Sequence, residues 1–188
     1  MAWEMRRELT LSLTPSMVPL MSITRKLELD FAISQATYLH ELYFSADFAS
    51  ALYLEGLQFS RCEQLRFERG ADGSIDRTLR LCPTMNAPKP VQKILGDTQQ
   101  YDEIGSFSPA SNTWSYEVVP ATMANKVKTI GRMTVQPKGP SQCTVSFEVT
   151  FDVHIFGVGK VIERFMASQF DENLRKQKDF TESWMARL

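Results

Sequence analysis

The residues of this chain whose type and spacing could do chemistry are charged side chains on an otherwise apolar strand face. A predicted hairpin carries Arg61, Glu63 and Arg77 at odd positions, the same positions that hold its apolar residues. A charged group on an apolar face needs a partner or water, so two interpretations stay open. The three residues form the polar end of a pocket, holding a carboxylate, hydroxyl or phosphate of a ligand. Alternatively, they form an Arg–Glu pair at the water-exposed rim of the sheet.

Tyr116, Glu103 and Arg77 form a second set, with acid–base potential. A cyclisation, in which a reactive chain is folded onto itself, needs only a shaped pocket and one or two acid–base groups. The alternative is ordinary packing and ion pairing, which we favour. No catalytic residue is therefore assigned.

Motifs of other chemistries do not occur in the sequence. There is no GxSxG nucleophile elbow, His40 falls on a predicted helix, and His154 falls on the water-facing side of a predicted strand. Gly157 and Gly159 form a lone GxG before a helix, which is more typical of a flexible joint than of a phosphate loop. We expect neither a metal ion nor a cofactor.

Composition narrows the class of protein. The formal net charge is −1 with both signs interspersed, so we expect no nucleic-acid partner. Cys62, Cys82 and Cys143 form no CxxC pair, which argues against a zinc site or a disulfide scaffold and favours the cytoplasm. No apolar run approaches the roughly twenty residues of a membrane-spanning helix. We interpret residues 1–22 as a poorly ordered segment and residues 23–188 as a single domain.

The end of the chain shows the clearest structural pattern. Over residues 143–155 every odd position is apolar and every even position is polar, which is typical of a strand with one buried face. Residues 156–159 interrupt this pattern, and Val158, Ile162 and Phe165 then recur at helical spacing. A long helix that leaves the last strand can cover the apolar face of an antiparallel sheet.

The rest of the chain predicts an α+β protein with a curved antiparallel sheet of about seven strands. Residues 24–31 form the first strand, and two short helices over residues 35–44 and 47–55 follow, with Ser34 and Ser45 as N-caps. No βαβ alternation occurs, so the sheet is antiparallel. The remaining strands are expected over residues 57–68, 74–82, 98–107, 113–119, 127–137 and 143–155.

This order of elements resembles the START-like, or helix-grip (SRPBCC), superfamily, as does the strand-to-helix passage HIFGVGKVIE over residues 154–163. Within it, the chain is most similar to bacterial START-like proteins of uncharacterised function. The resemblance covers residues 24–188 and implies a sheet that grips the C-terminal helix across its face. It also implies a cavity for a lipid, sterol, isoprenoid, polyketide-like or other apolar molecule, without saying which.

Strand alternation predicts the side chains that face such a cavity, although the same side chains could pack a solid core. The predicted ligand-binding residues are Phe59, Arg61, Glu63, Leu65, Arg77, Leu79, Trp114, Tyr116, Met133, Phe147, Val149, Phe151, Ile162 and Phe165.

Residues 83–96 do not fit the pattern of strands, because their prolines lack the donor that a sheet ladder needs. Val91, Ile94 and Leu95 give this segment an apolar edge beside two lysines. We predict that they gate the cavity and touch a membrane surface transiently. A surface loop that is merely anchored to the core is the alternative.

The register of the hairpin follows from its alternation. A three-residue loop over residues 71–73 keeps the apolar residues of both strands on one face. Phe67 then lies opposite Arg77, and Cys62 lies opposite Cys82 on the other face.

These patterns predict a carrier or sensor of an apolar small molecule that has no catalytic activity. One alternative is a polyketide cyclase or aromatase-like enzyme that uses the same pocket. The other is an interaction domain with a filled core.

Overall fold

The computed structural model of the chain describes residues 22–84, 87–95 and 99–187. Most of the predicted N-terminal segment therefore lies outside the described residues. The elements follow in the order β1 (Ile23–Phe31), η1 (Thr37–Tyr43), α1 (Ala46–Ala51), η2 (Leu52–Gly56), β2 (Arg61–Arg69), β3 (Ile75–Cys82), α2 (Lys89–Leu95), β4 (Tyr101–Ser108), β5 (Thr113–Pro120), β6 (Val127–Pro137), β7 (Cys143–Val153) and α3 (Gly159–Met185).

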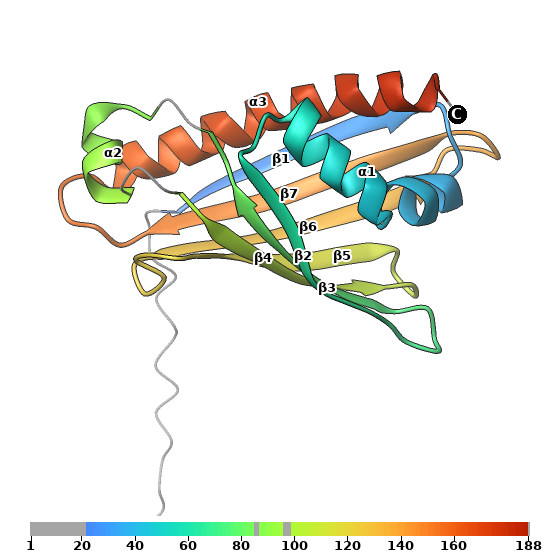
Figure 1. Ribbon diagram of the computed structural model, residues 1–188, viewed down its shortest axis with the longest axis horizontal. Helices are drawn as coiled ribbons and strands as arrows, with labels where there is room; N and C mark the ends of the chain where they lie inside the picture. The colour runs from blue at the N-terminus through green and yellow to red at the C-terminus, as the bar shows by residue number, and fades with distance from the viewer. Residues whose placement is uncertain (1–21, 85–86, 96–98, 188) are drawn as a thin grey trace, which may run out of the picture.

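One curved, seven-stranded antiparallel sheet carries the fold, with the strand order β1-β7-β6-β5-β4-β3-β2. The helix α3 runs along the inner side of this sheet and contacts β1, β7 and η2 (Figure 1). In Figure 1, α2 lies near the start of α3, and α1 lies toward its other end. The predicted fold class, strand number and covering helix are confirmed.

Two short helical segments follow β1, as predicted, and serine caps begin them. The Ser34 hydroxyl accepts a hydrogen bond from Thr37 N at 3.1 Å, and the Ser45 hydroxyl accepts one from Phe48 N at 3.4 Å. The segments η1 and η2 are π-helical, which the sequence did not indicate. The segments η1, α1 and η2 together form a helical elbow. Gly56 ends η2, where an added Cβ would come within 2.8 Å of the Phe180 ring, so this helical elbow packs closely against α3.

The passage from β7 to α3 is fixed by two glycines and one buried carboxylate. Gly157 has a φ of +79°, which favours glycine. A Cβ on Gly159 would lie 2.5 Å from the carbonyl oxygen of Val153. The Oε1 atom of Glu163 accepts a hydrogen bond from Val153 N at 3.1 Å, which ties the first turn of α3 to the end of β7.

The turn of the β2–β3 hairpin has the predicted three-residue loop. Gly70 N donates a hydrogen bond to the carbonyl oxygen of Ser74 at 2.9 Å, and Gly73 has a φ of +83°. Phe67 lies opposite Arg77, also as predicted. Near the turn, the alternation therefore gave the correct register.

Before Arg66 the predicted register is wrong, because a β-bulge lies between Gln64 and Arg66. The extra residue, Leu65, reverses the facing of everything that precedes it on β2. Cys62 lies opposite Leu81 and packs into the core, whereas Cys82 lies opposite Arg61. The two thiols are thus on different faces of the sheet, not neighbours on one face.

Of the helices that the structure describes, none is both long enough and apolar enough to cross a membrane.

Candidate functional site

A cavity of about 240 Å³ lies between the inner face of the sheet, the helix α3 and the helical elbow. It is lined by aromatic and aliphatic side chains from both halves of the chain. Of the predicted ligand-binding residues, the cavity wall includes Phe59, Arg77, Tyr116, Phe147, Val149, Phe151 and Phe165.

Four other predicted residues pack the core instead of the cavity wall. Leu79, Trp114, Met133 and Ile162 are almost fully buried, and none of them lines the cavity. Trp114 shows the reason, because it packs edge-on against Phe44 with ring centroids 5.5 Å apart and fills the space at that end of the sheet. One part of the inner face therefore forms the cavity wall, and another part packs a solid core, so each of the two predicted roles applies to a part of this face.

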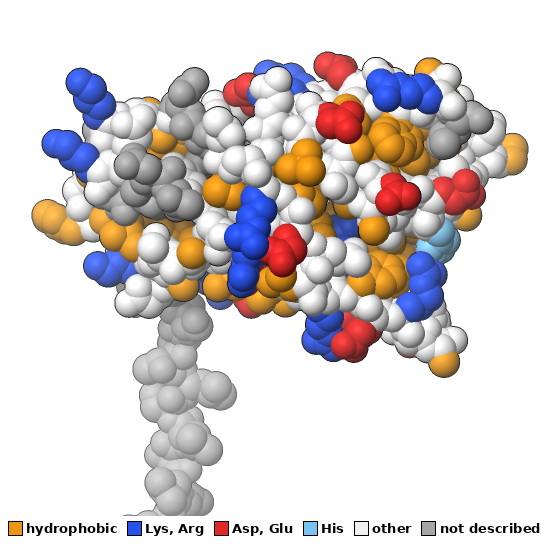
Figure 2. Space-filling model, in the orientation of Figure 1, with side chains coloured by type: hydrophobic (Ala, Val, Ile, Leu, Met, Phe, Trp, Pro, Cys, Tyr) orange, Lys and Arg blue, Asp and Glu red, His pale blue; other side chains and the backbone are white. Residues whose placement is uncertain are grey.

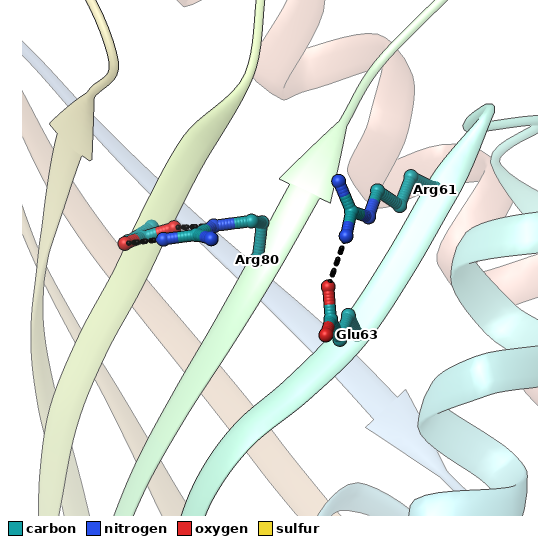
Figure 3. Close-up of polar contacts among 4 residues, drawn as sticks. Arg61, Glu63 and Arg80 are labelled. Atoms are coloured by element: carbon teal, nitrogen blue, oxygen red, sulfur yellow. Dashed lines mark hydrogen bonds and ion pairs between the residues drawn. The ribbon is translucent and has the colours of Figure 1, made fainter.

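Arg61, Glu63 and Leu65 do not face the cavity, which corrects their predicted placement. The bulge turns them to the outer face of β2, where Leu65 is 42% exposed. Arg61 Nη2 lies 2.5 Å from Glu63 Oε2, and this ion pair lies beside the one between Arg80 and Asp102 (Figure 3). The alternative of a water-exposed Arg–Glu pair therefore describes these two residues.

Arg77 behaves differently from Arg61, because its side chain is only 2% exposed. Its Nη1 donates to the carbonyl oxygen of Tyr43 at 2.7 Å, and its Nη2 lies 3.4 Å from Glu103 Oε1 on the adjacent strand. The guanidinium also lies 4.8 Å from the centre of the Tyr43 ring and 5.1 Å from that of Trp114. Arg77 Nε has no hydrogen-bond partner. The cavity wall thus holds a buried ion pair, in which the Glu103 carboxylate offsets the charge of the Arg77 guanidinium.

The Glu103 carboxylate is the acid–base group of this wall. Burial raises its pKa, and the opposing effects of Arg77 and of the nearby Tyr53 hydroxyl are smaller. A carboxyl group with a raised pKa holds a proton more readily than one on the surface, so Glu103 can donate as well as accept hydrogen bonds.

Four tyrosines surround this ion pair. Tyr43, Tyr53, Tyr101 and Tyr116 line the cavity, and burial raises the pKa of each phenol, so all four are neutral hydroxyls. Of these, only Tyr116 was among the predicted ligand-binding residues. Tyr43 and Tyr53 come from the helical elbow, whose cavity-facing side was not predicted, and Tyr101 begins β4.

A polar stripe on α3 faces the same cavity. Gln169, Asn173 and Gln177 lie four residues apart and all line it. The prediction omitted them because it followed the apolar stripe of the helix. Their helical spacing beside Phe170 and Leu174 is the signal that could have identified them.

The predicted gate lies on the short helix α2. Val91 is fully buried and packs with Val127, Ile155 and Ile162, so it anchors α2 to the core. The side chains of Ile94 and Leu95 lie outside the described residues, and their gating role stays a prediction.

No three His, Cys, Asp or Glu side chains within the described residues gather closely enough to hold a metal ion.

Solved structures with the same architecture match most of the chain. A START superfamily protein from Mycobacterium smegmatis is 17% identical with a TM-score of 0.56, and the match covers 87% of this chain and 98% of that one. The Zhui aromatase/cyclase from Streptomyces sp. R1128 is 11% identical with a TM-score of 0.60, covering 84% and 90%. Norcoclaurine synthase from Thalictrum flavum is 16% identical with a TM-score of 0.58, covering 85% and 93%. At these identities the similarity shows the fold alone.

The comparison with curated proteins found no match. The model of one family, described as protein of unknown function (DUF2505), matches residues 28–185. The chain therefore belongs to the DUF2505 family, and its fold is the START-like helix-grip fold.

Proposed function

We propose that this protein is a carrier or sensor that binds a mainly apolar small molecule between the sheet and α3. The observation that supports this most strongly is the cavity itself, whose wall is largely aromatic and aliphatic. Its volume of about 240 Å³ is many times what a single water needs. An interaction domain with a filled core would have no such space, so that alternative is disfavoured.

The size of the cavity favours a compact ligand. Pockets for drug-sized molecules begin at about 300 Å³, slightly above the volume here. Removal of apolar ligand surface from water, at about 25 cal/mol per Å², would supply most of the affinity.

The polar end of the cavity favours a neutral group on the ligand. Glu103 balances the charge of Arg77, and the surrounding tyrosines are neutral. A free carboxylate or phosphate would meet the Glu103 carboxylate, which disfavours an anion in this low-dielectric site. A hydroxyl, phenol or ketone can instead bond to Glu103, Tyr53 or an amide of α3.

The direct test is extraction of the purified protein followed by mass spectrometry of the extract, combined with binding of a hydrophobic fluorescent probe. Val118 and Val119 provide a matched pair, because Val118 lines the cavity and its sequence neighbour points to the other face. We expect Val118→Phe to abolish saturable probe binding and Val119→Phe to preserve it. No extracted ligand together with no saturable binding would refute the carrier.

An aromatase- or cyclase-like enzyme is the second candidate, favoured by one observation. Glu103 has a raised pKa and lies among tyrosine hydroxyls in the cavity, which is the environment of a general acid. Turnover of a polyketide- or isoprenoid-like substrate that Glu103→Gln abolishes, with probe binding unchanged, would establish the enzyme over the carrier.

We also propose that the protein works in the cytoplasm. Cys62, Cys82 and Cys143 are all free, which suits a reducing compartment.

A further inference from the structure

Phe156 is the most exposed large apolar side chain that the structure describes. It lies in the loop between β7 and α3, and its side chain is fully exposed. Val161, in the first turn of α3, is 43% exposed. In Figure 1 this loop forms one end of the molecule, beside α2. A phenyl ring held completely in water at the tip of a loop is costly unless it is buried against something else.

Basic side chains surround this tip. The three segments that meet there, residues 87–95, 121–128 and 152–164, include exposed lysines and an arginine. Figure 2 shows blue Lys and Arg side chains gathered at the same end, with an orange hydrophobic projection at its edge. The basic residues of these segments are Lys89, Lys93, Lys126, Lys128, Lys160 and Arg164.

The acidic side chains of these three segments, Asp152 and Glu163, offset only part of that charge, because six basic side chains stand against two carboxylates. Asp152 Oδ2 lies 3.0 Å from His154 Nε2 and is mostly shielded from solvent. Glu163 is fully buried, where it bonds to Val153 N and lies 3.3 Å from Lys160 Nζ. This end is therefore positive although the whole chain has a formal net charge of −1.

We propose that this end docks on an anionic lipid bilayer, with Phe156 inserted between the headgroups and the lysines against lipid phosphates. A single projecting ring with cations around it suits a flat, deformable, negatively charged surface, because the ring needs apolar depth and the cations need phosphates. Docking goes beyond the proposed ligand binding and does not require it.

The docking end adjoins the cavity. Ile155 and Val158 flank Phe156 and pack in one cluster with Val91, Phe165 and Met166. Phe165 and Met166 also line the cavity. A bilayer contact at Phe156 would therefore lie one layer of side chains from the bound ligand.

Vesicle flotation of the full-length protein tests the proposal, with vesicles of phosphatidylcholine alone or mixed with phosphatidylglycerol. We expect binding to the mixed vesicles only, and loss of that binding in high salt. Phe156→Ser should weaken it about tenfold through the lost apolar insertion. The matched control is Leu54→Ser, which removes another exposed apolar side chain on η2, beside the far part of α3, and should change nothing.

Two double lysine variants test whether the positive charge at this end is needed for vesicle binding. The double variant Lys89→Gln/Lys93→Gln should lose about tenfold in binding. The control variant Lys176→Gln/Lys178→Gln, toward the other end of α3, should bind the mixed vesicles as the wild type does. Equal losses in the two double variants would mean that only net charge matters, which would overturn the proposed site.

Two further measurements distinguish a bilayer from a second copy of this chain as the partner that Phe156 contacts. Phe156→Trp should show a blue-shifted emission on mixed vesicles and quenching by brominated lipids, beyond the response of the wild-type tryptophans. Light scattering should find the same mass for the wild type and Phe156→Ser. A wild-type dimer that Phe156→Ser dissociates would assign the tip to a second copy of this chain, and no binding to mixed vesicles would refute docking.

Discussion

The ring of Tyr116 lies directly over Gly131 on the neighbouring strand, where a Cβ would come within 2.2 Å of the ring. Gly105, on the other neighbouring strand, leaves room for Trp114 in the same way. The inner face therefore holds two large aromatic side chains flat against the sheet because two strand positions have no side chain. Tyr116 lines the cavity, whereas Trp114 packs in the core beside it.

This packing gives the first prediction. Gly131→Ala should destabilise the protein by about 2 kcal/mol, because the added methyl group must displace the Tyr116 ring. Urea unfolding measures the change, and a double-mutant cycle isolates its cause. In a Tyr116→Ala background the same substitution should cost little, and an unchanged cost there would contradict the steric explanation.

The buried ion pair gives the second prediction. Arg77→Met should lower the free energy of unfolding at pH 7 by about 3–5 kcal/mol, because it leaves the Glu103 carboxylate buried without its cation. The loss should shrink toward pH 4, where Glu103 takes up a proton and no longer needs a counterion. The control is Arg80→Met, on the same strand but on the outer face, where the ion pair with Asp102 is partly solvated. Its effect should be much smaller and should persist to lower pH, because Arg80 holds the pKa of Asp102 below its ordinary value and Asp102 therefore stays charged in more acidic solution.

The third prediction concerns Glu103 itself. Its pKa is raised in the folded protein above the ordinary value of 4.5, mainly by burial. A raised carboxyl pKa stabilises the fold below the unfolded pKa, and this stabilisation is lost as the pH rises through the folded pKa. The wild type should therefore lose stability relative to Glu103→Gln as the pH rises above 4.5. A parallel pH dependence of the two unfolding free energies would show that Glu103 has an ordinary pKa.

The fourth prediction separates the two possible roles of α2, a gate and an anchored surface segment. Ile94→Ser/Leu95→Ser should slow the exchange of a bound hydrophobic probe with vesicles, while the melting temperature changes little. Val91→Ala should do the opposite, because Val91 is fully buried and its truncation leaves a cavity worth about 2 kcal/mol. If both variants only lower the melting temperature, α2 is an anchored surface segment and not a gate.

The fold could be predicted because its largest elements repeat their pattern over many residues. The alternation over β7 extends across the whole strand, and the apolar stripe of α3 recurs over several turns. In such elements one ambiguous residue does not change the assignment. Short elements lack this redundancy, so the π-helical character of η1 and η2 was not predicted.

The candidate site could be predicted only in part, for two physical reasons. The bulge at Leu65 has no local signal, because β2 contains neither a glycine nor a proline that would mark it. Because of this single inserted residue, the prediction placed Arg61, Glu63 and Leu65 on the inner face, although they lie on the outer face. The other reason is tertiary packing, because Tyr43 and Tyr53 reach the cavity only through the position of the elbow against the sheet.

The pairing of β1 with β7 has a consequence for how the chain folds during synthesis. Ile23 lies opposite Phe151, so β1 finds its partner strand only after β2 to β6 have been made. Until then, residues 23–31 present an unpaired edge, and the core under α3 cannot close. Such long-range pairing is typical of folding in milliseconds to seconds rather than microseconds. A nascent chain arrested before residue 143 should therefore expose β1 to proteases and chaperones, and its release should depend on the last strand and helix.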